Sequence, residues 1–197
     1  MGKGQMNMKR SGIISLVVLF VVLAAIVASY AFHINRKAAQ DVEKVVESTA
    51  VQKVLMKDLE RNYPPTPKEV VKYFAEITKC FYNEDYTEEE LEQLALKIQG
   101  LYDTELIENK SQEDYMADLR SEIASMKNSE SKISSYVLSS SVDVEEFVEN
   151  GYSCARLYCT FNVKQGTSGT VRSMEQFVLR KDDDGHWKIF GWELVEE

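Results

Sequence analysis

The sequence predicts an α+β domain that follows an N-terminal transmembrane helix. Residues 12–32 form an uncharged, apolar run of 21 residues. Three amphipathic helical patterns then lie between residues 66 and 126, and after residues 127–131 the period of the apolar residues changes to two. Because helices come first and strands follow, we expect three helices packed on one face of a curved antiparallel sheet.

The chain carries its charge unevenly. Its 197 residues have a formal net charge of −9, yet residues 1–37 hold five basic side chains and no acidic one. The other 160 residues hold 18 basic and 32 acidic side chains, a net charge of −14. A surface this acidic repels phosphate backbones, so nucleic acid is not an expected partner of the domain.

The run from Gly12 to Phe32 is long enough to cross a membrane. At about 1.5 Å per residue, a helix of this length covers roughly 30 Å, the thickness of the hydrocarbon core. The alternative is a signal peptide cleaved near Ser29-Tyr30-Ala31, but the apolar part of such a peptide is only about 7 to 15 residues long. We therefore expect an uncleaved transmembrane helix over residues 12–32.

Basic residues on the two sides of this run set its expected orientation. Three precede the run and two follow it: Lys3, Lys9 and Arg10, then Arg36 and Lys37. The positive-inside rule then places residues 1–11 in the cytoplasm as a short tail. The protein is accordingly expected in the cell membrane, as a single-pass protein whose C-terminal domain is extracytoplasmic.

Residues 33–62 are expected to form a stalk between the membrane and the domain. Their helical rhythm of apolar residues is interrupted around Ser48 to Gln52. The prolines of Tyr63-Pro-Pro-Thr-Pro67 then disfavour both helix interior and central strand, since proline lacks an amide donor. The folded domain is therefore predicted to span residues 63–197.

Each of the three predicted helices begins at a hydroxyl residue with an acidic residue three positions later, an arrangement that caps the first turn. The first helix is expected from Thr66 to Tyr82, with proline at its first position. The second runs from Thr87 to Tyr102 and the third from Ser111 to Met126. All three space their apolar residues by threes and fours, which predicts one buried face.

Strands are predicted where the period changes to two. From Tyr152 to Lys164, apolar residues alternate with mostly polar ones, so one face of this strand should be buried. Asn150-Gly151 is a strong signal for a type I′ hairpin to the preceding strand, near Val142 to Glu149. Later strands from Thr170 to Lys181 and from His186 to Val195 complete a meander of four or five strands.

The chain has only three cysteines and two histidines, so few residues are available as metal ligands. Cys80, Cys154 and Cys159 form no C-x-x-C motif. Cys154 and Cys159 are five residues apart in one strand and point to opposite faces, so they cannot pair without disrupting it. We expect buried thiols and no bound metal, with a disulfide from Cys80 to the sheet as the alternative.

The order of three helices and a long meander that closes on Gly185-His-Trp-Lys-Ile-Phe-Gly-Trp192 resembles the cone-shaped nuclear transport factor 2-like superfamily. The segments 63–73, 176–180 and 185–189 are also similar to a family of membrane-anchored proteins of unknown function from anaerobic Firmicutes. The superfamily contains enzymes, ligand binders and assembly modules, so the resemblance implies a cone-like fold and no single function. Its membrane-tethered members include assembly factors of secretion and conjugation machines, which self-associate or bind neighbours.

No catalytic constellation is predicted. Ketosteroid isomerases of this superfamily use a carboxylate with a tyrosine or a second acid inside the cone. The resemblance makes four residues candidates for such roles: Tyr82, Asp85, Tyr86 and Asp103. A solvated acidic loop is the preferred interpretation of the first three, because glutamates surround them. His186 is interpreted as an exposed residue at a strand end, and Asp182-Asp-Asp-Gly185 as a hairpin turn rather than a calcium loop.

Aromatic residues supply the candidates for a pocket or an interface. They are Trp187, Phe190 and Trp192 in the last strand and Tyr158 in an earlier one. The two tryptophans are five residues apart and so lie on opposite faces of a regular strand. One is expected in the core, and the other in a concave pocket or against a partner.

The sequence therefore favours a membrane-anchored, extracytoplasmic interaction or assembly module without a catalytic site or cofactor. Its expected partners are the membrane and either another protein or a second copy of the chain. A small-molecule-binding cone fold is the alternative, and an enzyme of the same fold ranks third because no acid-base pair can be named.

Overall fold

Helices and strands occupy separate halves of the chain, as the sequence predicts. The structure is a computed structural model in which residues 48–195 are described. The predicted cytoplasmic tail (1–11) and transmembrane helix (12–32) lie outside the described residues. Within residues 48–195, no helix is both long and apolar enough to cross a membrane.

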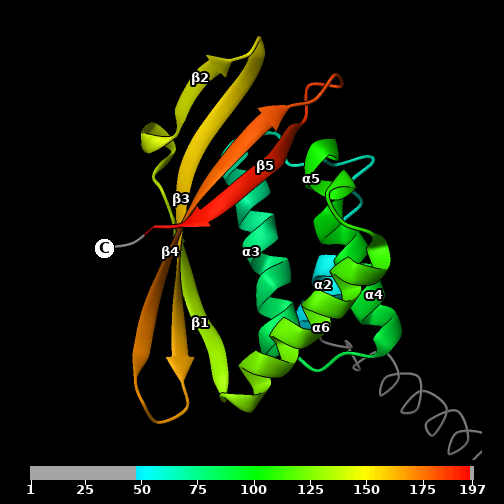
Figure 1. Ribbon diagram of the computed structural model, residues 1–197, viewed down its shortest axis with the longest axis vertical. Helices are drawn as coiled ribbons and strands as arrows, with labels where there is room; N and C mark the ends of the chain where they lie inside the picture. The colour runs from blue at the N-terminus through cyan, green and yellow to red at the C-terminus, as the bar shows by residue number, and fades with distance from the viewer. Residues whose placement is uncertain (1–47, 196–197) are drawn as a thin grey trace, which may run out of the picture. The chain divides into compact units, whose positions relative to one another are not determined.

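The described part of the chain contains five α-helices ahead of the sheet (Figure 1). They are α2 (Ala50–Leu55), α3 (Pro67–Asn83), α4 (Glu88–Gln99), α5 (Thr104–Glu108) and α6 (Gln112–Asn128). Helices α3, α4 and α6 are the three predicted ones. Their predicted caps are confirmed, because the side chains of Thr66, Thr87 and Ser111 each accept a hydrogen bond from the backbone amide three residues later.

Helix α4 ends at Gln99, earlier than the predicted Tyr102. The reason is a competing partner for the backbone, since the Ile189 amide donates to the Leu101 carbonyl and the Asp103 amide donates to the Ile189 carbonyl, both at 2.8 Å. Residues 101–103 therefore lie along the last strand of the sheet instead of continuing the helix.

The domain boundary predicted at residue 63 is corrected by helix α2. The compact unit begins at Ser48, within the expected stalk, and Thr49 caps α2 through a capping box with Gln52. The interruption of the apolar rhythm at this point is thus a helix start. Val51 and Val54 are buried in the main core, so part of the predicted stalk belongs to the folded domain.

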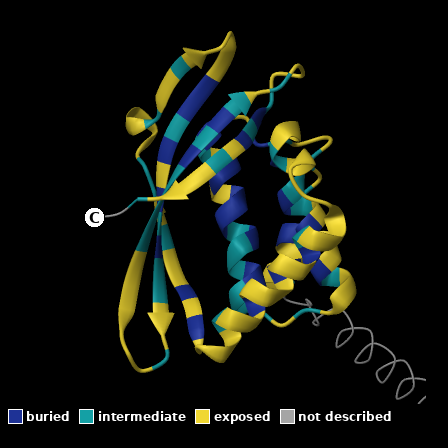
Figure 2. Ribbon diagram, viewed as in Figure 1, coloured by how far each residue is buried: buried dark blue, intermediate teal, exposed yellow. Residues whose placement is uncertain are grey.

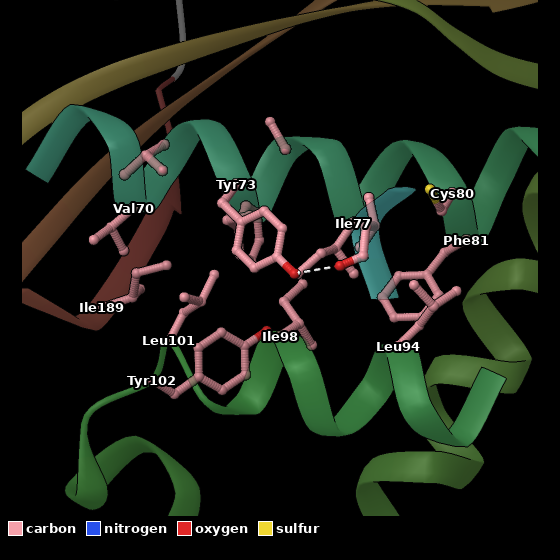
Figure 3. Packing of buried hydrophobic residues seen from close by; sticks show 14 of the residues in the cluster. Val70, Tyr73, Ile77, Cys80, Phe81, Leu94, Ile98, Leu101, Tyr102 and Ile189 are labelled. Carbon is pink, nitrogen blue, oxygen red and sulfur yellow. Dashed lines mark hydrogen bonds between the residues drawn. The ribbon is translucent and has the colours of Figure 1, made fainter. Parts of the chain in front are cut away.

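A buried tyrosine ties α2 to α3. The Tyr73 hydroxyl donates a hydrogen bond of 2.7 Å to the Val54 carbonyl, as Figure 3 shows. Tyr73 is fully buried, so neither group can use water instead. This bond holds α2 against the rest of the core.

Replacement of Tyr73 by phenylalanine should lower the free energy of unfolding by about 1 to 2 kcal/mol. The substitution keeps the ring but leaves the buried Val54 carbonyl without its donor. The effect is measured by urea denaturation. Tyr152→Phe is the matched control, since that ring is exposed and the change should cost within about 0.5 kcal/mol. Equal effects of the two substitutions would contradict a structural role for α2.

The sheet is antiparallel throughout. Its strands are β1 (Ser131–Leu138), β2 (Glu145–Glu149), β3 (Tyr152–Gln165), β4 (Thr170–Lys181) and β5 (Trp187–Leu194). They follow the order β1-β3-β4-β5, and β2 also pairs with β3. Strand β1 pairs with the C-terminal part of β3 and β2 with its N-terminal part, so β1 and β2 run in line along one edge. The 3-10 helix η1 (Ser141–Asp143) separates them.

The predicted hairpin between β2 and β3 is confirmed. Asn150 and Gly151 have φ values of 52° and 87°, and a type I′ turn needs positive φ at both central residues. The α+β class and the antiparallel sheet are confirmed as well. The strand β1, which precedes the predicted strand near Val142 to Glu149, was not assigned separately from the sequence.

The five α-helices of residues 48–195 lie on one side of the sheet (Figure 1). Helix α3 packs directly on it and contacts β1, β3 and β5. The inward residues of the central strands are fully buried, among them Leu157, Phe177 and Leu179. Figure 2 shows buried and more exposed residues alternating along β3 and β4. One core therefore joins the helices to the inner face of the sheet.

The three cysteines are free thiols and all are buried, as the sequence predicts. Burial raises the pKa of Cys80 to about 11 and that of Cys159 to about 12. A disulfide from Cys80 to the sheet is not formed. The thiols act as small apolar groups in the core.

The prediction that Trp187 and Trp192 lie on opposite faces of their strand is wrong. The register between β4 and β5 shifts where Val178 pairs with Gly191 and Leu179 pairs with Ile189, which leaves Phe190 as an extra residue in β5. Such a β-bulge reverses the alternation beyond it. Trp192 pairs with the buried Phe177, so both tryptophans face the helices.

A candidate ligand pocket between the helices and the sheet

A cavity of about 810 Å³ lies between the helices and the inner face of the sheet. Residues of α3, α4, α6, β3, β4 and β5 line it, and this volume is typical of sites for small molecules. The residues that give it chemical character are Phe74, Tyr82, Tyr102, Glu122, Glu175 and Trp192. The cavity is therefore the main candidate site within residues 48–195.

The inner face of β4 changes from apolar to polar along the strand. Phe177 and Leu179 are fully buried. Glu175 and Ser173 lie on the same face of β4, two and four residues before Phe177. Both line the cavity. Glu175 pairs across the sheet with the buried Cys159. A carboxylate thus stands on the inner face of the sheet among apolar neighbours.

Aromatic rings form one wall of the cavity. The Trp192 ring lies 5.3 Å from Phe74, 5.7 Å from Tyr102 and 6.0 Å from Phe177, measured between ring centroids. Phe177 and Trp192 are stacked, with an interplanar angle of 19°. Although Trp192 faces inward, it remains 40% exposed. It is a wall of the cavity rather than part of the closed core.

Phenols and carboxylates also line the cavity. The Tyr82 hydroxyl on α3 donates a hydrogen bond of 3.2 Å to the Glu122 carboxylate on α6. Burial raises the pKa of Tyr82, Tyr102 and Tyr115, so all three phenols stay protonated at neutral pH. The cavity therefore offers hydroxyl donors beside two carboxylates.

Glu175 has a strongly perturbed acidity. Burial, followed by the charge of Glu122, raises the pKa of its carboxyl from the ordinary 4.5 to about 7. Perturbed carboxyls of this kind gather at functional sites. At neutral pH Glu175 is close to half ionised, so it can accept a proton or bind a charged group.

Glu175→Gln should stabilise the domain at pH 8 by up to about 3 kcal/mol. The folded state holds the Glu175 proton more tightly than the unfolded state, so its stabilising effect is complete below pH 4.5 and is lost as the pH rises through about 7. The glutamine side chain does not ionise, so the variant does not lose stability as the pH rises. Urea melts from pH 4 to 8 measure it, and the exposed Glu193→Gln on β5 is the matched control. A variant no more stable than the wild type at pH 8 would contradict the raised pKa.

The structure separates the four aromatic residues predicted for a pocket or an interface. Trp192 lines the cavity, whereas Trp187 is only 5% exposed and belongs to the core. Phe190 and Tyr158 are partly exposed on the opposite face of the sheet. Phe190 lines a second hollow of about 590 Å³ there. The four residues do not form one site.

Of the acid and tyrosine candidates, only Tyr82 lines the cavity. Asp85 is exposed, and the Tyr86 hydroxyl donates to the Phe81 carbonyl at 2.8 Å. Asp103 is buried and binds Arg180 through two hydrogen bonds of 2.9 and 2.6 Å. Tyr86 and Asp103 are therefore structural in the fold, and Asp85 lies on the surface.

His186 and its acidic turn lie between β4 and β5. The His186 ring stacks on Tyr63, with centroids 4.4 Å apart. Asp182 accepts hydrogen bonds from the backbone amides of Asp184 and His186. Ligand atoms of these three residues lie within 4.8 Å of one another, an arrangement that the hydrogen bonds of the hairpin turn produce.

Sequence analysis missed Glu175, Glu122, Tyr102 and Tyr115 as site residues. For Glu175 a signal existed in the sequence. Side chains alternate between the two faces of a strand, so Glu175 shares the inner face with Phe177 and Leu179. An acidic residue on a buried face is unusual and indicates function. Glu122 carried no such signal, since it lies among the polar residues of an amphipathic helix, and Tyr115 resembles an ordinary residue of the apolar face of that helix.

The family of the chain follows from its sequence match. Residues 6–192 match the family described as a domain of unknown function, DUF6715. No curated protein matches the chain. Because the match extends over nearly all of the 197 residues, including every strand and helix that builds the cavity, the chain belongs to the DUF6715 family.

Proposed function

We propose that this domain binds a small organic molecule in the cavity between the helices and the sheet. The observation that carries the proposal is Glu175, a carboxyl with a pKa of about 7 on the inner face of the sheet. A core built only for stability gains nothing from such a group, because burying it costs free energy. A binding site can use it to recognise a ligand.

Binding is favoured over catalysis by what the cavity lacks. Among the described residues that line it, there is no histidine or cysteine, and the single lysine, Lys110, forms an ion pair with Asp118. Among these residues the cavity therefore has no cysteine nucleophile, no unpaired lysine and no histidine base, which favours binding over covalent catalysis of those types.

A cone-like fold of the nuclear transport factor 2-like type is part of this proposal. Its support is an antiparallel sheet with helices on one face only and a cavity lined from both layers. The Glu175 side chain would then stand inside the cone, where the fold has room for a ligand.

We also propose that the domain works outside the cytoplasmic membrane, tethered by residues 12–32. The support is the uncharged run of 21 residues and the basic residues ahead of it. A ligand would then be captured at the outer surface of the cell membrane. Protease added to intact protoplasts should remove the domain, and its protection there would contradict this orientation.

The exposed outer face of the sheet favours a second function, protein interaction. Tyr152, Tyr158 and Phe190 are aromatic residues that remain exposed there. Aromatic residues on an uncovered sheet face are typical of interfaces. Sedimentation of the purified protein tests this candidate through self-association that Tyr158→Ser weakens.

The primary test is a thermal-shift screen of the purified full-length protein against a panel of small molecules. Ser173→Phe should abolish any stabilisation, because Ser173 lines the cavity and the ring would fill it. Ser134→Phe on the exposed surface of β1 is the matched control and should leave binding unchanged. Ligands that bind equally well to Ser173→Phe would contradict a site in the cavity.

A further inference from the structure

The cavity has an excess of negative charge. Its acidic lining residues are Asp118, Glu122 and Glu175, and its only basic lining residue in the described chain is Lys110. Lys110 is paired with Asp118. Within residues 48–195, neither Glu122 nor Glu175 forms an ion pair with a basic side chain, so the cavity holds two carboxylates without a counter-charge.

These two carboxylates repel each other across the cavity lining. The charge of Glu122 acts on Glu175 and helps to raise its pKa. A bound positive charge would satisfy both groups and relieve their mutual repulsion. A bound anion would add a third negative charge to a partly buried site.

The aromatic wall suits the same kind of ligand. Trp192 and Tyr102 lie 5.7 Å apart, and Phe74 lies within 6.4 Å of both. Faces of aromatic rings attract cations, and tryptophan attracts them most strongly. Carboxylates and aromatic rings that line one cavity are a combination that recognises organic ammonium groups.

We infer that the ligand is an organic cation, an amine or quaternary ammonium compound with an apolar body. Its charged group would lie between Glu122, Glu175 and the Trp192 ring, and its body would fill the apolar part of the cavity near Phe81 and Phe161. This inference rests on the proposed binding function and adds the chemical class of the ligand.

Binding of such a cation should depend on pH. The titratable groups that face Glu175 are Glu122 on α6, Tyr82 on α3 and Cys159 on β3. Burial raises the pKa of Tyr82 and of Cys159, the latter to about 12, so both stay neutral between pH 6 and 8. Glu175, with a pKa of about 7, changes its charge in that range, and affinity should rise about tenfold from pH 6 to 8.

The experiment is isothermal titration of the full-length protein in lipid nanodiscs with benzyltrimethylammonium. Benzyl alcohol and phenylacetate are the neutral and anionic probes of similar shape. We expect the cation to bind at least tenfold more tightly than either of them at pH 8. We expect this preference to shrink by about tenfold at pH 6.

Two variants identify the groups responsible. Glu175→Gln and Glu122→Gln should each reduce the affinity for benzyltrimethylammonium by tenfold or more, and Glu175→Gln should also remove the change with pH. Glu193→Gln, on the neighbouring strand but the opposite face of the sheet, should change neither.

The outcomes separate this inference from the proposed function. If benzyl alcohol binds as tightly as the cation and Ser173→Phe abolishes both, the cavity is a binding site but the inference of a cationic ligand is overturned. If the cation binds equally to wild type and Glu175→Gln, the inference is likewise overturned. If none of the three probes binds and Ser173→Phe leaves every ligand of the thermal-shift screen unaffected, the proposed function is overturned too.

Discussion

Asp103→Ala is expected to destabilise the domain by about 3 to 5 kcal/mol, because it leaves the guanidinium of Arg180 without its buried partner. The Asp103 carboxylate receives two hydrogen bonds from Arg180, from Nε at 2.9 Å and from Nη2 at 2.6 Å. The side chains of Asp103 and Arg180 are only 6% and 15% exposed. The Arg180 guanidinium also lies over the rings of Tyr152 and Phe190, so it has little access to water.

Two further variants isolate the ion pair in urea melts. Glu105→Ala removes the other carboxylate bound to Arg180, which is exposed, and should cost less than about 1 kcal/mol. Asp103→Asn keeps a side chain that can cap α5, a role Asp103 performs through the Glu105 amide, but loses the charge. If Asp103→Ala cost no more than Glu105→Ala, the pair would not support the fold.

Trp187→Ala is expected to cost about 3 to 5 kcal/mol of stability, since it removes a large buried ring and leaves a cavity. Trp187 is almost fully buried, its backbone carbonyl accepts a hydrogen bond of 2.9 Å from Tyr63, and Lys181 lies over its ring. Trp192→Ala should cost clearly less, because that ring already borders an open cavity. The main expected effect of Trp192→Ala is weaker ligand binding.

Thermal melts and ligand titration of both variants separate the two roles. His186→Ala is the control for a change in the same segment, and it should cost no more than about 1 kcal/mol because its ring is partly exposed and stacks on Tyr63. Equal losses of stability for the two tryptophan variants would contradict the assignment of Trp192 to the cavity wall.

Helices α3, α4 and α6 were predictable because their signals are local. The hydroxyl caps Thr66, Thr87 and Ser111 each act within one turn of their own helix. The hairpin at Asn150-Gly151 is local in the same way, since two residues with positive φ determine the turn. The α+β class followed from the order of these local patterns.

The candidate site could not be predicted in the same way, because its residues come from distant parts of the chain. Glu122 and Glu175 meet only when α6 packs beside the sheet, and Tyr82 reaches Glu122 across forty residues of sequence. Each residue by itself resembles an ordinary polar position. Their combined effect on the pKa of Glu175 exists only in the folded domain.

By itself, the sequence determined the α+β class, the capped helices and the absence of a disulfide between Cys154 and Cys159. The anchor over residues 12–32 stays a prediction. The tertiary structure alone decided where the domain begins, because the burial of Val51 and Val54 depends on a core built by later residues. It also decided the direction of Trp192, because the bulge at Phe190 arises from the pairing of β5 with β4. Patterns of period and capping are set by neighbours along the chain, whereas a bulge, a half-buried carboxyl with a raised pKa and a cavity are set by neighbours in space.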